Sequence, residues 1–241
     1  MQISLDRAPV DQQLRLGPVL KPGLGDRLRR MGLYPGCILR REDEEVALSP
    51  VRVRGPKGEA TLSAGMAAKV IVHHDDGHKT PVIEMLPGEE GHIEGFTAGT
   101  DLQQALCTLG LCEFDRIQLL RKIPPMRYTV RLGEHHRLYL TEGMTAKLWG
   151  GMDGREMQFA NARKGHPFTV ATILGGDSAR EQIAALGIRP GSVLTLENVG
   201  PDLAVGNEDG RDCIVVTSAD GLRLYLKPDQ AASIIVDVEA T

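Results

Sequence analysis

The stretch RRMGLYPG, residues 29–36, combines the signals for the end of a helix and for a tight turn. Three apolar residues precede its first glycine at i, i+4 and i+7 spacing, on one face of a short helix: Leu24, Leu28 and Met31. Gly32 can adopt the left-handed backbone of a Schellman cap, in which the next residue, Leu33, packs back on Leu28. The proline-glycine pair that follows predicts a turn that leads into a strand.

The same pattern occurs twice more along the chain. Gly110 and Gly187 end the second and third copies, and the three capping glycines are 78 and 77 residues apart. The apolar stripes before them are Leu102, Leu106 and Leu109 in the second copy and Ala179, Ile183 and Leu186 in the third. Leu111 and Ile188 occupy the position of Leu33. A single cap would occur by chance in many proteins, but even spacing indicates an internal repeat.

A second feature repeats in step with the first. Residues 60–71, 138–149 and 224–235 each predict a strand, a one-turn helix and another strand. The second copy follows the first after 78 residues and the third follows the second after 86, so the third copy carries extra residues. The polar segment NEDG, residues 207–210, is the predicted insertion at a loop tip.

The repeat divides the 241 residues into three modules near the lower size limit for a self-sufficient core. We predict these modules at residues 1–77, 78–154 and 155–241, with short linkers at residues 73–78 and 150–154. Short strands of alternating polarity usually close into a small barrel that hides their edges. The predicted fold class is therefore mainly β with short helices, as three tandem small β-barrels with one short helix each.

The composition argues against several classes of protein. Aromatic residues make up 4% of the chain and the net charge is −4, and both values argue against a nucleic-acid partner. No apolar run reaches the roughly 18 to 20 residues of a membrane span, and the first residues lack a signal-peptide pattern, so we expect a cytoplasmic protein. Neither a GxxxxGK[ST] phosphate loop nor a pattern of catalytic residues is present, so we expect no enzymatic activity.

Nearly the whole chain, as three tandem copies, resembles a known family, most strongly in the first copy and moderately in the second and third. Residues 28–36 and 50–71 follow the order LxxMGLxPG and then PVxV…G…LxLxxxMAxxIxV, which is similar to the FeoA family, ferrous iron transport protein A. It is also similar to the C-terminal domain of diphtheria-toxin-repressor-type metalloregulators. The resemblance implies SH3-like barrels and a small cytosolic partner of the FeoB membrane transporter. The second copy has Glu113 and Phe114 where the others have Pro-Gly, so we expect its turn to be built differently.

The leading functional hypothesis is a non-enzymatic adaptor of ferrous iron uptake that binds the cytosolic part of a FeoB-type transporter and meets the membrane only through it. Arg27, Arg29 and Arg30 are candidate partner-binding residues, because clustered cations suit an acidic protein surface. A solvated helix face is the alternative explanation of this cluster. The capping glycines are expected to be structural.

A rival hypothesis is a transition-metal carrier or sensor. His73, His74, Asp76 and His78 offer imidazoles and a carboxylate to a divalent ion such as Fe(II), Mn(II) or Zn(II), and no other cofactor is expected. Solvated linker residues are the alternative, because the spacing matches no recognised site and no second shell is evident. An RNA-binding barrel is a third possibility, which the negative net charge of the chain disfavours.

Overall fold

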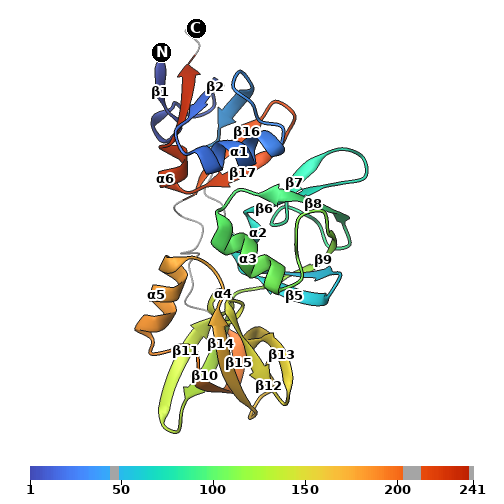
Figure 1. Cartoon of the computed structure of the whole chain (residues 1–241), viewed down its shortest axis with the longest axis vertical. Coiled ribbons are helices and arrows are strands. Elements are labelled where there is room, and N and C mark those ends of the chain that lie inside the picture. Colours follow the sequence, from blue (N-terminus) through green and yellow to red (C-terminus); the bar gives the residue numbers. More distant parts are fainter. Residues whose placement is uncertain (44–48, 203–212, 239–241) are drawn as a thin grey trace.

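The computed structural model describes residues 1–43, 49–202 and 213–238. These residues form three six-stranded antiparallel sheets with short helices, so the prediction of a mainly β fold is confirmed. The three sheets follow one another along the long axis of the molecule (Figure 1). We call each sheet with its helices a module: module A at the top of Figure 1, module B in the middle and module C at the bottom.

The three sheets share one strand order. Sheet A runs β1 (Gln2–Ser4), β18 (Ile234–Val238), β2 (Gln13–Val19), β3 (Ile38–Arg41), β16 (Ile214–Ser218) and β17 (Arg223–Leu226). Sheet B runs β7 (Lys79–Pro81), β6 (Val70–His73), β8 (Glu90–Phe96), β9 (Arg116–Lys122), β4 (Val51–Gly55) and β5 (Gly58–Leu62). Sheet C runs β13 (Arg155–Gln158), β12 (Leu148–Met152), β14 (Pro167–Ile173), β15 (Val193–Pro201), β10 (Met126–Leu132) and β11 (His136–Thr141).

The helices repeat in the same way. Each module has one nine-residue helix: α1 (Pro22–Arg30), α3 (Thr100–Thr108) and α5 (Asp177–Ala185). Each also has a one-turn helix between two strands, as the sequence predicts: α2 (Ala64–Ala67), α4 (Glu142–Thr145) and α6 (Pro228–Ala231). Short 3-10 turns at Leu5–Arg7 and Phe159–Asn161 complete modules A and C.

All three predicted Schellman caps are present. The capping glycines have positive φ angles of 93°, 77° and 81° at Gly32, Gly110 and Gly187. In the first cap the Leu33 amide donates to the Leu28 carbonyl at 2.9 Å, and the Gly32 amide donates to the Arg29 carbonyl at 3.0 Å. The same two hydrogen bonds recur in the second and third copies. These are the two bonds that define the motif, so the local prediction is confirmed three times.

We expect Gly32→Val to cost about 1 to 2 kcal/mol of stability, through the left-handed backbone alone. A Cβ atom at Gly32 would have no neighbour within 4 Å, so crowding adds nothing to this cost. Chemical denaturation of the full chain measures the change. Gly32→Asn is the control and should cost less, since asparagine tolerates this conformation; an equal loss in both variants would contradict the assignment.

Each sheet combines halves of two sequence repeats. In sheet B, β4 pairs with β9 from the following repeat, where Val53 lies opposite Leu119. In sheet A, β3 pairs with β16 from the last repeat, where Arg40 lies opposite Thr217. Sheet A also joins the two ends of the chain, because β1 pairs with β18. The repeat period is therefore correct, but a repeat does not fold as one module.

This exchange corrects the predicted module boundaries. The boundary between residues 77 and 78 falls within the β6–β7 hairpin, and the boundary between residues 154 and 155 falls within the β12–β13 hairpin. The segments predicted as linkers, residues 73–78 and 150–154, belong to these hairpins. The chain instead leaves one module for the next between β3 and β4, between β9 and β10, and between β15 and β16. The predicted insertion at residues 207–210 lies outside the described residues.

The modules pack against one another through apolar and polar contacts. The core of module B includes Val215 and Tyr225 from module A and Leu174 from module C. At the B–C junction the buried Gln158 amide accepts from the Thr61 backbone N–H at 2.8 Å and donates to its carbonyl at 2.7 Å. Burying an amide is favourable only when it is hydrogen-bonded in this way. The paired amide therefore holds one mutual arrangement of the two modules.

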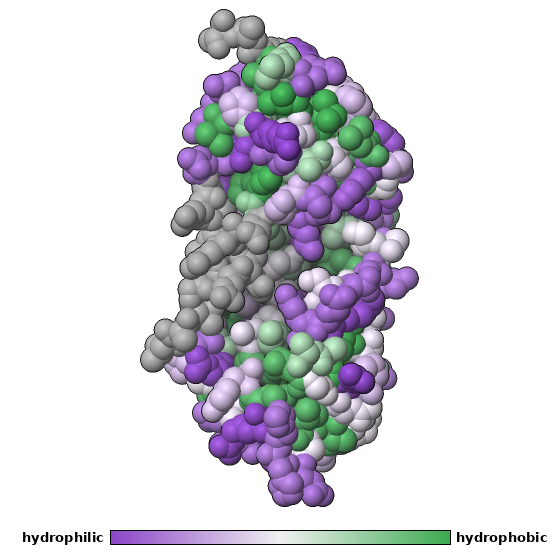
Figure 2. Space-filling model, turned by 90° about the vertical axis from the view of Figure 1, so that its left-hand side faces the viewer, coloured by the Kyte–Doolittle hydropathy of each residue, from purple (hydrophilic) through white to green (hydrophobic). Residues whose placement is uncertain are grey.

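In the coloured part of the face that Figure 2 shows, hydrophobic patches on the two end modules lie among hydrophilic residues. Among the helices of the described ranges, none has the length and apolar character needed to cross a membrane.

Candidate functional site

The predicted metal-binding residues lie in and beside the turn of the β6–β7 hairpin, in sheet B. His74 is buried, and both of its ring nitrogens are within hydrogen-bond distance of protein oxygens. Nδ1 lies 2.9 Å from the Glu90 carbonyl oxygen, and Nε2 lies 2.8 Å from the Thr80 hydroxyl. A metal would have to displace one of these partners, because each imidazole nitrogen has one bonding direction.

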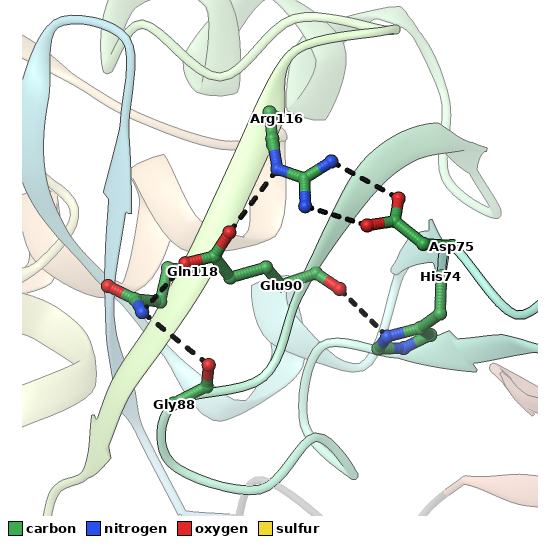
Figure 3. Close-up of polar contacts among 6 residues, drawn as sticks. All are labelled: His74, Asp75, Gly88, Glu90, Arg116 and Gln118. Atoms are coloured by element: carbon green, nitrogen blue, oxygen red, sulfur yellow. Dashed lines mark hydrogen bonds and ion pairs between the residues drawn. The ribbon is translucent and has the colours of Figure 1, made fainter.

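The acidic part of the turn is held by ion pairs (Figure 3). The Arg116 guanidinium donates to both Asp75 oxygens at 3.1 and 2.8 Å and contacts Glu90 through Nε at 3.3 Å. Gln118 donates to Glu90 from the other side at 2.9 Å. The hydrogen bond from Arg116 holds the pKa of Asp75 below its usual value. This network ties the turn to strands β8 and β9 and accounts for its charged residues.

The remaining histidines of the hairpin have separate partners. His73 lies 3.5 Å from Glu94, on the strand face opposite to His74. The His78 ring stacks on His74 with centroids 4.1 Å apart, and its Nδ1 contacts Asp76. Hydrogen bonds from His78 lower the pKa of Asp76. The bond from its backbone N–H has the larger effect and the bond from its ring the smaller. The structure thus brings His74, His78 and Asp76 to one turn but leaves His73 apart.

Metal binding at this hairpin stays a prediction. No group of three or more candidate ligands converges anywhere in the described ranges 1–43, 49–202 and 213–238. The contacts of the hairpin agree with a hydrogen-bonded turn that is tied to strands β8 and β9.

The three arginines of α1 point to different neighbours. Arg29 pairs with Asp26 on the same helix, and Arg30 reaches Glu113 of module B at 3.4 Å. Arg27 lines a cleft between the modules, and burial lowers its pKa. The three arginines therefore have no common neighbour, and Arg30 marks the place where modules A and B meet. Their role in partner binding stays a prediction.

Phe114 is the residue of this region that the sequence prediction missed. It has a φ of 71° at the position of Gly36 (100°) and Gly191 (88°), and its ring is 79% exposed. Its amide donates to the Ile93 carbonyl at 2.8 Å, as the two glycines donate to the equivalent strand. The expectation of a differently built turn is therefore wrong. The turn is the same, and a bulky residue adopts a conformation that favours glycine.

We define the capping-turn surface as Arg30, Tyr34, Glu113 and Phe114. The Arg30–Glu113 ion pair joins the last residue of α1 to the turn that follows α3, and Tyr34 adds a second aromatic ring that is 53% exposed. Residues with a strained backbone are often found at functional sites, where the side chain has a role that glycine could not fill. Exposed aromatic rings next to an arginine are typical of protein-binding surfaces. The alignment of Phe114 with two glycines was the sequence signal that could have found it.

Comparison with known proteins adds no relative: no family model, curated protein or solved structure matches this chain. The similarity of residues 28–36 and 50–71 to the FeoA pattern is therefore the ground for a family proposal, together with the geometry above.

Proposed function

We propose that this chain is a non-enzymatic cytoplasmic adaptor of ferrous iron uptake that binds the cytosolic part of a FeoB-type transporter. The capping-turn surface is the proposed contact. The observation that carries the proposal is Phe114, an exposed aromatic residue in the left-handed position where both other copies have glycine.

The fold supports the family part of the proposal. With β1, β7 and β13 set aside as edge additions, each sheet has its strands in one order: the strand after the one-turn helix, the two strands that flank the long helix, and then a hairpin. This order and the one-turn helix before the last strand are consistent with an SH3-like module. We propose that each sheet curves into a small SH3-like barrel.

The tandem arrangement supports an adaptor role. Related turns follow the long helix in all three modules, so one chain presents three variants of the surface. When one module binds, the others are held at high effective concentration near the same partner. Only the turns of modules A and B carry an exposed aromatic ring, so we assign the primary contact to these two modules.

The test is a titration of the full chain against the cytosolic domain of a FeoB-type transporter. We expect Phe114→Gly to weaken binding at least about tenfold, as removal of an aromatic anchor does. The same variant should stabilise the free chain by about 1 kcal/mol, because glycine relieves the left-handed strain. Gain of stability with loss of binding is the signature of a residue kept for function.

Leu86→Ala is the matched control, since Leu86 is an exposed apolar residue of the same module at 61% exposure. It should leave the affinity unchanged. Wild-type protein that did not bind the transporter domain would refute the proposal. A stoichiometric Fe(II), Mn(II) or Zn(II) site that disappeared in His73→Ala and His78→Ala would favour the metal carrier instead.

A further inference from the structure

A cleft of about 760 Å³ lies between the three modules. The first turns of α1, α3 and α5 line it, together with the one-turn helices α2 and α6. In Figure 1 helices α3, α5 and α6 lie on the same side of the molecule, one from each module. The volume is within the range of about 300 to 1,000 Å³ that small-molecule sites occupy.

Basic side chains from all three modules converge on this cleft. They are Lys21, Arg27, Lys69, Lys147 and Lys227. The acidic residues in the described part of the lining are Asp101, Asp177 and Asp229. Among the described lining residues the basic side chains therefore outnumber the acidic ones, on a chain whose net charge is −4. Such a local reversal of sign favours an anionic ligand.

Part of this charge is already paired. Lys21 contacts Asp229 at 2.8 Å, and that hydrogen bond lowers the pKa of Asp229. Asp177 contacts Arg180 at 3.1 Å. Among the described residues these pairs use two of the three carboxylates, and no ion pair joins Arg27, Lys69 or Lys227 to a carboxylate.

Lys69 is the central unpaired cation. Its ammonium has no hydrogen bond or ion pair with any residue in the described part of the chain, although the residue is partly buried. The pKa of Lys69 is lowered to about 8, mainly by burial and to a smaller extent by the positive charge of Lys227. The Nε atom of Arg27 is likewise buried without a hydrogen-bond partner among the described residues. Two cations held in this way are costly to the fold unless an anion accompanies them.

The starts of α1, α3 and α5 face the same cleft, and helix dipoles favour negative charge at this end. The third N–H of each helix donates to the carbonyl of its N-cap residue, and Pro22 at the start of α1 has no N–H. Asp101 and Asp177 already supply part of the favoured negative charge at α3 and α5. Apolar side chains of Leu24, Met66 and Leu102 form the rest of the lining.

We propose that this cleft binds a small organic molecule that carries two or more phosphate groups. The separate lysines and the three helix ends match several phosphate groups rather than one, because they come from different modules. The apolar lining accommodates the organic part. This inference goes beyond the adaptor role and does not depend on it.

The test is isothermal titration calorimetry of the full chain with ATP and with inorganic triphosphate, without metal ions and at about 50 mM salt. We expect one site per chain, with tighter binding of ATP than of inorganic triphosphate. Lys69→Gln and Lys227→Gln should each weaken ATP binding at least about tenfold, since each removes a charge-assisted contact to phosphate. Thermal melting of both variants without ligand should show a folded protein, and Lys69→Gln should melt no lower than the wild type.

Lys164→Gln is the matched control, because Lys164 is exposed on module C outside the cleft. It should leave ATP binding unchanged. Absence of ATP binding by the wild type, or an equal loss in Lys164→Gln, would overturn the proposal. Equal affinities for ATP and inorganic triphosphate would overturn the role of the apolar lining.

Discussion

A fragment of residues 49–125 should fold cooperatively alone, whereas a fragment of the same length, residues 78–154, should stay unfolded. The first fragment contains all six strands of sheet B with α2 and α3. The second contains three strands of sheet B and three of sheet C, so neither sheet is complete. A core of this size is near the limit of stability, and half of it cannot hold the chain.

The buried residues explain why the loss is so large. The segment before residue 78 supplies much of the module B core: Val51, Val53, Ala60, Leu62, Met66, Val70 and Val72. Each buried aliphatic side chain contributes about 1.5 to 3 kcal/mol, so removal of the set exceeds the total stability of a small domain. Circular dichroism and urea denaturation of the two fragments measure the difference. Cooperative unfolding of residues 78–154 would contradict the exchange between repeats.

Gly150→Ala should destabilise the protein by about 3 kcal/mol, although Gly150 lies in a segment that the sequence predicts as a linker. Gly150 is part of β12, and an added Cβ would meet the Thr169 carbonyl oxygen at 2.0 Å and the Phe168 ring at 2.9 Å. The carbonyl belongs to the paired strand β14 and cannot rotate away. Phe168 is fully buried against Phe159, so the ring has no free space either.

Gly151→Ala is the adjacent control. The nearest atom to its added Cβ is the Arg155 carbonyl oxygen at 3.9 Å, which is ordinary contact. We expect a change within about 0.5 kcal/mol, as for other uncrowded substitutions. Thermal unfolding of both variants under the same conditions measures the difference in stability between Gly150→Ala and Gly151→Ala. Similar stability in the two variants would mean that β12 and β14 do not approach as closely as described.

The exchange between repeats also affects how the chain folds. Sheet A pairs Gln2 with Asp237 and Arg40 with Thr217, so its closure requires nearly the whole chain. Modules B and C use contiguous segments and can form earlier. Long loops must be closed before such distant contacts form, which slows this step. The first and last strands, β1 and β18, lie side by side in module A, as Figure 1 shows.

The candidate sites differ in how far the sequence could predict them. The histidines of the β6–β7 hairpin attracted attention by residue type, but the ring contacts of His74 depend on Thr80 and Glu90, which only the folded hairpin brings near. The cleft lysines come from three modules. Lys69 and Lys147 hold the same position of the repeat, but nothing in the sequence shows that they face one cleft. Residue type predicts chemistry, whereas convergence of side chains from distant segments is a property of the tertiary structure.

The sequence alone determined the local structure of this protein. The capping glycines, the apolar stripes and the one-turn helices depend on neighbours within a few residues, and they are found where the pattern predicts them. Only the tertiary structure decided which strands pair, because the repeats are alike and their alternating faces fit one another almost equally well. The short segments that connect the strands decide between these pairings. Between β9 and β10 the chain has three residues, of which Pro124 and Pro125 favour an extended path, so the chain continues into the next module instead of turning back.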